Sequence, residues 1–235
     1  MTNRRESPNM THRFQKPRSF IAMFAAALVA LTAVACGSDD SKSAGGGGGT
    51  EGVAAIEKAF LTGMFHHHES AIEMAEIAQE TGKDPYVKNL ADDIAMTQEG
   101  EIEDMKTIYS RLVGGELRPD PGAHDGLGLS AEEAGMTHTA ETNEMLRSAD
   151  PFDRAFVDEM EPHHVGAVKM AEVVLESTKD AELRKLAGGI ISTQEREIDE
   201  MNSFRTEKFG SPVPEDAGHG GDKPAGEEHG AGHSG

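Results

Sequence analysis

The sequence "MFHHHESAIEMAE" at Met64–Glu76 returns further along the chain as "MEPHHVGAVKMAE" at Met160–Glu172. The first methionine, two of the histidines and the Met-Ala-Glu ending keep the same spacing in both stretches. The likeness extends beyond them, because residues 60–105 align with residues 156–201 without a gap and about 20 of the 46 aligned pairs are identical. Self-similarity over this length predicts two copies of one supersecondary unit.

The spacing of apolar residues predicts that each copy begins with an amphipathic helix. At 100° of rotation per residue, one side of the first helix collects Met64, His67, His68, Ala71, Met74, Ala75 and Ala78. The opposite side is acidic, with Glu69, Glu73 and Glu76. A helix with one apolar and one charged side needs a packing partner.

A second helix follows in each copy after a short turn. "ETGKDP" at residues 80–85 contains a Gly and a Pro that end one helix and start the next, and a further apolar stripe continues to residue 108. The second copy repeats this pattern as helices at residues 163–176 and 183–204. Two such hairpins, neither of which buries its apolar side alone, pack most simply as a four-helix bundle. We therefore predict an all-α fold with repeats at residues 60–113 and 151–209.

Residues 114–150 connect the two repeats. Their first part, "GGELRPDPGAHDGLGLS", is rich in Gly and Pro and predicts a loop. Ser130 followed by two glutamates has the pattern of a capped helix start, so we predict an extra connecting helix from Ser130 to about Leu146. Asp150 and Pro151 then predict the N-cap and the first residue of the next helix.

The first 35 residues have the layout of a secretory signal peptide, with a basic stretch, an apolar run from Phe20 to Val34 and small residues before Cys36. The apolar run is shorter than the ~20 residues of a membrane span. Cys36, the only cysteine of the chain, stands where a bacterial lipoprotein is cleaved and acylated. We expect an exported lipoprotein of the cell membrane that faces the extracytoplasmic side, with a plain secreted protein as the alternative.

These features divide the chain into four parts. We predict a signal peptide at residues 1–35, a lipid-anchored flexible linker at 36–52, the bundle at 53–209 and a disordered tail rich in His and Gly at 210–235. The linker is predicted from its Gly and Ser content. The tail is predicted from its Gly, Pro and charged residues and its lack of apolar periodicity.

The composition favours cations as partners. The formal net charge is −20, and the predicted signal peptide is itself basic, so its removal makes the chain more negative. Nucleic acid is therefore not expected as a partner, contact with the membrane is expected through the N-terminal lipid only, and the sequence identifies no protein partner. No cysteine remains after Cys36, so any metal site must use His, Met, carboxylate, amide or backbone groups.

The histidines on the apolar sides are the feature that packing alone does not account for. Side chains three or four residues apart meet on a helix, so Met64 can converge with His67 and His68, while Met74 lies further along the same side. The candidate metal ligands in the two copies are Met64, His67, His68, Met74, Met160, His163, His164 and Met170. A hydrogen-bonded structural network of histidines and ordinary packing of methionines are the alternatives.

Polar residues also occur on the apolar stripe of the second helix of each copy. Together with one methionine per copy they form the set Gln98, Glu101, Met105, Gln194, Glu197 and Met201. These residues are candidates for additional ligands, or for groups that accept an imidazole N–H and fix its tautomer. His66 lies off the apolar side and is replaced by Pro162 in the second copy, so we predict that it is a surface residue.

The combination of donor groups points to a soft metal ion. Thioethers with imidazole suit Cu(I) and, by analogy, Ag(I), while imidazole alone also suits Cu(II) and Zn(II). We therefore predict copper as the bound ion, and a function in sequestering it or handing it on. Whether the copies form two sites or share one stays open at this point.

The doubled motif resembles a known family. The unit "F…M…HH…A…MA" followed by "I…TQ…EI…M", and above all "FDRAFVDEMEPHHVGAVKMA" at residues 152–171, is similar to domain of unknown function 305 over about residues 53–209. The resemblance implies a ferritin-like helical bundle, export from the cytoplasm and, for some members, copper binding and resistance. The motif positions of the family fall on the eight candidate ligands named above. The first copy departs from the pattern at residues 56–60, where "IEKAF" stands in place of "FDRAF".

Two other functions remain as alternatives. One is a metal-free structural or interaction module. The other, less favoured, is a ferritin-like di-iron oxidase, which needs Glu-x-x-His on two helices; Glu161 and His164 have this spacing, but Phe65 stands at the matching place in the first copy. Since the sequence has no recognisable activated Ser or Cys nucleophile and no phosphate-binding Gly-rich loop, we do not expect an enzyme.

Overall fold

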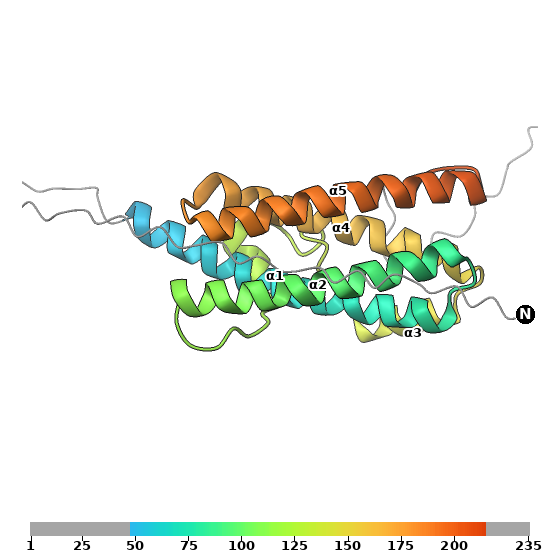
Figure 1. Cartoon of the computed structure of the whole chain (residues 1–235), viewed down its shortest axis with the longest axis horizontal. Helices are drawn as coiled ribbons and strands as arrows, with labels where there is room; N and C mark the ends of the chain where they lie inside the picture. Colours follow the sequence, from blue (N-terminus) through green and yellow to red (C-terminus); the bar gives the residue numbers. More distant parts are fainter. Residues whose placement is uncertain (1–47, 215–235) are drawn as a thin grey trace, which may run out of the picture. The chain divides into compact units, whose positions relative to one another are not determined.

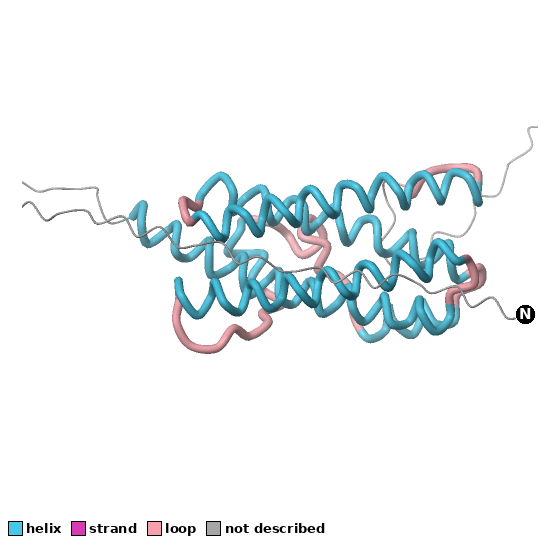
Figure 2. The backbone as a smooth tube through the Cα atoms, in the orientation of Figure 1, coloured by secondary structure: helices cyan, strands magenta, loops and turns pink. Residues whose placement is uncertain are grey.

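The computed structural model describes residues 48–214, and within this range the chain contains only helices and loops (Figure 2). The elements in chain order are α1 (Gly48–Thr81), α2 (Pro85–Leu112), the short 3₁₀ helix η1 (Ala123–Leu127), α3 (Ala140–Ser148), α4 (Phe152–Ser177) and α5 (Ala181–Phe209). The predicted all-α fold, built from two repeated hairpins with an extra connecting helix, is confirmed.

The two hairpin turns are built in the same way. Asp84 caps α2, because its side chain accepts a hydrogen bond from the backbone N–H of Tyr86, and Pro85 supplies the first residue of the helix. In the second repeat Asp180 caps α5 by accepting from the N–H of Leu183. The same side-chain chemistry at equivalent positions therefore starts the second helix of both hairpins.

The hairpins pack against each other mainly through α1 and α4 (Figure 1). These helices run antiparallel. Near one end of the contact Thr178 donates a hydrogen bond to Glu57, and near the other end the backbone N–H of Lys83 donates to Asp153 at 2.9 Å. Helices α2 and α5 each pack on the first helix of their own hairpin. Equivalent parts of the two repeats thus meet where α1 and α4 cross.

The core separates into two apolar clusters along the crossing of α1 and α4. One cluster contains residues from 60–65 of α1 and 167–174 of α4. The other contains residues from 71–78 of α1 and 152–160 of α4. The histidines at 67–68 and 163–164 lie between these ranges in both helices. A polar layer therefore divides the apolar interior near its middle.

The connecting helix is shorter than the sequence indicates. The capping pattern at Ser130 is present, because Ser130 and Glu133 bond each other's backbone N–H groups, but a single turn follows and Gly135 has φ +65°. The continuous helix begins only at Ala140, with Thr139 as its cap. The predicted helix start at Ser130 is wrong because the chain must turn at Gly135 to pack closely on α4.

Two boundaries also differ from expectation. Helix α1 begins at Gly48, five residues before the predicted start of the bundle, so the last residues of the predicted linker are helical. Pro151, rather than Asp150, is the N-cap of α4.

The predicted signal peptide, Cys36 and most of the linker and tail lie outside the described residues. Among the helices of residues 48–214, none combines the length and apolarity that a membrane span requires.

Candidate metal centre

Four histidines form the polar layer between the two apolar clusters. They are His67 and His68 of α1 and His163 and His164 of α4, and none is more than 4% exposed. The rings of His67 and His163 lie face to face at a tilt, with centroids 3.7 Å apart and 40° between their planes. The ring of His68 lies 6.2 Å from that of His67, and His164 lies 6.4 Å from His163. The histidines of the two repeats therefore form one group.

Two of these imidazoles are oriented by carboxylates from the second helix of their own hairpin. His68 Nε2 donates a hydrogen bond to Glu101 at 2.8 Å, and His164 Nε2 donates to Glu197 at 2.9 Å. A carboxylate oxygen accepts the hydrogen, so the tautomer that fits this bond has its proton on Nε2 and its lone pair on Nδ1. Neither Nδ1 has a hydrogen-bond partner. Carboxylate–histidine pairs of this kind orient imidazoles that bind metals.

The remaining two histidines differ from each other. His67 Nε2 donates to the backbone carbonyl of His163 at 2.9 Å, and its Nδ1 has no partner. His163 has no partner at either ring nitrogen. A buried polar atom without a partner costs about 1–3 kcal/mol of folding free energy. The layer thus holds five buried imidazole nitrogens that the fold leaves unsatisfied.

Burial also sets the charge state of the central pair. Removal from water lowers the pKa of His67 well below 6.5, with the neighbouring histidines adding to the effect, and the pKa of His163 is lowered in the same way. Both rings are therefore neutral at pH 7. Neutral imidazole, with a free lone pair, is the form that binds metal ions.

Six fully buried methionines lie on either side of the polar layer, in two sets of three. The first thioether set, Met64, Met105 and Met170, belongs to one apolar cluster, and the second thioether set, Met74, Met160 and Met201, belongs to the other. Each set combines residues from both hairpins.

The sorting of the methionines follows from the antiparallel crossing of α1 and α4. Ten residues of helix separate Met64 from Met74 by about 15 Å, so these two thioethers lie on opposite sides of the polar layer. Met170 instead comes close to the first repeat, since a Cβ placed on Gly63 would lie 3.1 Å from its terminal methyl carbon. The structure therefore brings Met170, and not Met74, to the neighbourhood of Met64.

Two buried amides complete the set of polar side chains in the interior. Gln98 of α2 and Gln194 of α5 are buried, and neither the oxygen nor the nitrogen of either amide has a hydrogen-bond partner. Each lies three residues before the glutamate that holds a histidine, which places both on the same side of the helix. Their oxygen atoms are available as further metal ligands in the interior.

The arrangement restricts which ions the centre can hold. Within residues 48–214, no group of three or more His, Cys, Asp or Glu side chains is arranged around one metal position. The carboxylate-rich pocket of a di-iron oxidase is therefore not formed by this part of the chain. An ion bound by the imidazoles would need thioether or amide ligands in addition, and such a mixed set favours soft ions.

One histidine of this region is not found by aligning the repeats. His138, in the loop before α3, lies with its ring 6.5 Å from that of His163, edge to face. Its Nε2 donates to Asn143 at 2.8 Å, and the Asn143 amide donates to Glu73 of α1 at 3.0 Å. His138 lies in the connecting segment and has no counterpart in either repeat, so only its residue type could have singled it out.

A hollow of about 530 Å³ opens beside this group. We call it the α1–α3 hollow, and it is lined by His66, Glu69, Ser70, Ile72, Glu73, His138, Thr139 and Ala140. His66, predicted to be a surface residue, is half-buried and forms part of this lining. The hydroxyl of Ser70 is buried without a hydrogen-bond partner.

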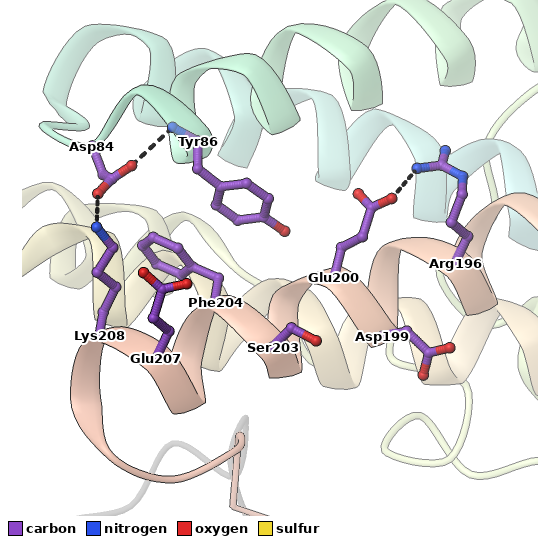
Figure 3. A pocket seen from close by; sticks show the side chains of 9 residues that line it. All are labelled: Asp84, Tyr86, Arg196, Asp199, Glu200, Ser203, Phe204, Glu207 and Lys208. Carbon is purple, nitrogen blue, oxygen red and sulfur yellow. Dashed lines mark hydrogen bonds and ion pairs between the residues drawn. The ribbon is translucent and has the colours of Figure 1, made fainter.

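A second hollow, of about 600 Å³, lies between the start of α2 and α5 (Figure 3). Tyr86 stacks on Phe204 there, and Asp84 binds Lys208 at 3.0 Å. The interior histidines do not line this hollow. Its charged rim is occupied by internal ion pairs, including Arg196 with Glu200, so we do not assign it to the candidate centre.

Comparison with known proteins gives a family and several similar structures. A family model described as "Domain of unknown function (DUF305)" matches residues 57–205. CopM, solved in a Cu(I)-bound form, is 32% identical with a TM-score of 0.55, and the match covers 66% of this chain and 98% of that one. CopM has also been solved in apo, Ag-bound and Cu(II)-bound forms. A putative secreted DUF305 protein from Streptomyces coelicolor is 25% identical with a TM-score of 0.60, over 68% of this chain and 98% of that one.

A curated relative matches a shorter stretch. "Uncharacterized protein L153" of Acanthamoeba polyphaga mimivirus is 39% identical over 56 residues, which are 24% of this chain and 37% of that protein. The chain thus matches little more than a third of the length of this relative. The name of the relative specifies no activity.

Proposed function

The chain belongs to the DUF305 family, and from this premise we propose that it binds copper outside the cytoplasm and sequesters the ion or hands it on. Cu(I) is the preferred ion, with Ag(I) as its analogue, and Cu(II) is bound through the imidazoles. The metal is the cargo of the protein, and we propose no catalytic step. The proposal rests on the histidine layer where the two repeats meet.

The observation that carries the proposal is the set of unpartnered imidazole nitrogens. His67, His68 and His164 each donate through Nε2 and keep a buried Nδ1 with no partner. A structural network of histidines would use these atoms in hydrogen bonds, because each one left unpaired costs about 1–3 kcal/mol. A ligand that accepts lone pairs removes this cost, and a metal ion is such a ligand.

The surrounding side chains decide between metals. Fully buried thioethers lie on both sides of the histidine layer, and thioether sulfur prefers Cu(I) and Ag(I) to hard divalent ions. Glu101 and Glu197 bind imidazole N–H groups, so we propose that they orient the histidines and do not take the ion themselves. CopM, with which this chain shares its fold and about a third of its aligned residues, has been solved with Cu(I), Ag and Cu(II), which supports the choice of ion.

We further propose that the centre is composite. His67 and His163 come from different repeats and touch through their rings, and each thioether set combines both hairpins. A site made by one hairpin alone would have neither feature. Exchanging the two repeats exchanges the two thioether sets, so we propose two equivalent positions for the ion, one on each side of the histidine pair.

The location of the protein is proposed from its first residues. We propose that residues 1–35 direct export and that Cys36 carries a lipid, so that the bundle faces the extracytoplasmic side of the membrane. The Streptomyces coelicolor neighbour is described as a putative secreted protein, which supports export but does not bear on lipidation.

Anaerobic titration with Cu(I) against a chromophoric chelator tests the proposal. Wild type should withdraw Cu(I) from the chelator, and the variant with His67, His68, His163 and His164 changed to Ala should not. Because four buried substitutions can unfold the bundle, a second variant carries Met64→Leu and Met160→Leu, changes that conserve volume and remove only sulfur. Binding by both variants as tight as that of wild type, with helical content retained, would exclude the proposed centre.

A further inference from the structure

An ion that binds at the histidine layer has to cross the surface of a closed bundle. His163, the most exposed of the four interior histidines, is only 4% exposed, and the thioethers are fully buried. A dissolved cation therefore cannot reach these side chains directly. The α1–α3 hollow is the described cavity that lies beside this layer, because His138 belongs to its lining and also contacts the ring of His163.

We propose that the α1–α3 hollow is the entrance through which a soft cation reaches the interior, and that His138 passes the ion to His163. This inference rests on the proposed function and adds a path to it. It assigns a role to His66 and His138, neither of which belongs to the candidate centre. The ligand is a monovalent soft cation, Cu(I) or Ag(I).

The lining of the hollow suits such a cation. Glu69 and Glu73 supply carboxylates and His66 and His138 supply imidazoles, on a chain whose formal net charge is −20. A concave site with charges of one sign raises the local concentration of counter-ions and their rate of arrival. The lining contains no methionine, so the hollow offers the ion fewer soft ligands than the interior does.

His138 is held in place between the hollow and the interior. Asn143 accepts from its Nε2, and Glu73 in turn accepts from Asn143, so the ring is fixed while Nδ1 keeps its lone pair. On the inner side, His163 has two ring nitrogens without partners. An ion held by His138 can therefore bind His163 without breaking a hydrogen bond of that ring.

The equivalent surface of the second repeat is closed. Ser70 of the hollow aligns with Gly166, and a Cβ on Gly166 would overlap the backbone of Ala134 and Gly135. The connecting segment thus covers α4 at the place where α1 is open. The path is therefore open on the α1 side and closed at the matching place on α4. This difference agrees with the position of His138, which lies on one side of the histidine layer only.

Stopped-flow transfer of Cu(I) from a chromophoric chelator to the full chain tests the path. The variant His138→Gln can still donate to Asn143 and should lower the rate of uptake by about tenfold, with the final amount of bound Cu(I) unchanged. His124→Gln is the matched control, because His124 lies in the same connecting segment, is half-buried and bonds the carbonyl of Leu129 away from the hollow. His66→Gln should slow uptake less than His138→Gln.

The outcomes separate this inference from the function on which it rests. Full uptake by all variants at the rate of wild type would overturn the path and leave the composite centre intact. Failure of wild type itself to take up Cu(I) would overturn both. A slower rate in His138→Gln together with the wild-type rate in His124→Gln and an unchanged end point would support the path.

Discussion

The two repeats have equivalent helices, caps and histidines, but their outer surfaces differ. At Gly166 the connecting segment lies directly on α4, and at the equivalent Ser70 the surface of α1 is hollow. The carboxylates behind the histidines differ as well, because Glu197 is 2% exposed and Glu101 is 15% exposed. Arg196 binds Glu197, while glycine stands at the equivalent position 100. The second repeat is therefore the closed half of the histidine layer, and the first repeat is its open half.

Removal of the two carboxylates should give the largest difference between the halves. Glu197→Ala leaves the Nε2–H of His164 without an acceptor in a dry site, and we expect a loss of about 3 kcal/mol in the free energy of unfolding. Glu101→Ala should cost only about 1 kcal/mol, because water can reach the vacated position. Urea denaturation measures both, with Glu99→Ala at an exposed position of α2 as the surface control. Equal losses would show that the closed and open halves do not differ in solvent access.

The close approach at Gly166 gives the next largest effect. Alanine normally stabilises the interior of a helix relative to glycine, but at this position its methyl group would overlap the connecting segment. We expect Gly166→Ala to lower the free energy of unfolding by about 2 kcal/mol. Ser70→Ala, at the open position, removes a hydroxyl without a partner and should be neutral or slightly stabilising. Stabilisation by Gly166→Ala would contradict the packing described here.

Much of this fold follows from local patterns, and the part that does not depends on distant contacts. The helices, the hairpin turn after Gly82 and the interior histidines are predicted from residue spacing and from Gly and Pro, because these signals act within a few residues. The capping pattern at Ser130 is also present, yet the predicted helix ends after one turn. Its length is decided by the packing of Gly135 on α4, which no local pattern records.

The candidate site shows the same division. The sequence correctly places Gln98, Gln194 and both glutamates in the interior or beside it, since their spacing matches the apolar stripe. It does not predict that Met170 joins Met64, because the pairing depends on how α1 and α4 cross. His138 escapes prediction for another reason, since it has no repeat partner. Roles of individual residues in binding copper remain predictions.

Double-mutant cycles can test whether the two hairpins share the thioethers of one site. Met64→Leu and Met170→Leu remove sulfur from the same set, so the first change should lower Cu(I) affinity by about tenfold and the second should add little once the first is present. Met160→Leu and Met170→Leu affect different sets and should be additive, although both lie on α4. Competition titrations measure the three single variants and the two double variants. If the effects of Met160→Leu and Met170→Leu, both on α4, were the coupled ones instead, the result would favour one separate site in each hairpin.

The smallest expected effect concerns a property in which the two halves should agree. Burial lowers the pKa of both His67 and His163 below 6.5, so below that pH the unfolded chain binds protons that the folded chain excludes. The free energy of unfolding of the metal-free protein should therefore rise with pH in this range, by about 1 kcal/mol per pH unit for each histidine. His67→Gln and His163→Gln should each remove one share of this slope. Denaturation between pH 5.5 and 7 measures it, and unequal shares would extend the difference between the halves to the central pair.

The meeting of equivalent residues where α1 and α4 cross has a consequence for how such a protein can arise. Residues related by the repeat, such as His67 and His163, face each other across the contact, as they do across the two-fold axis of an isologous dimer. One hairpin pairing with a second copy of itself would bring together the same imidazoles and, by the same exchange, both thioether sets. The fused chain keeps that symmetry in its interior and departs from it at the surface, where one connecting segment can cover only one of two equivalent faces.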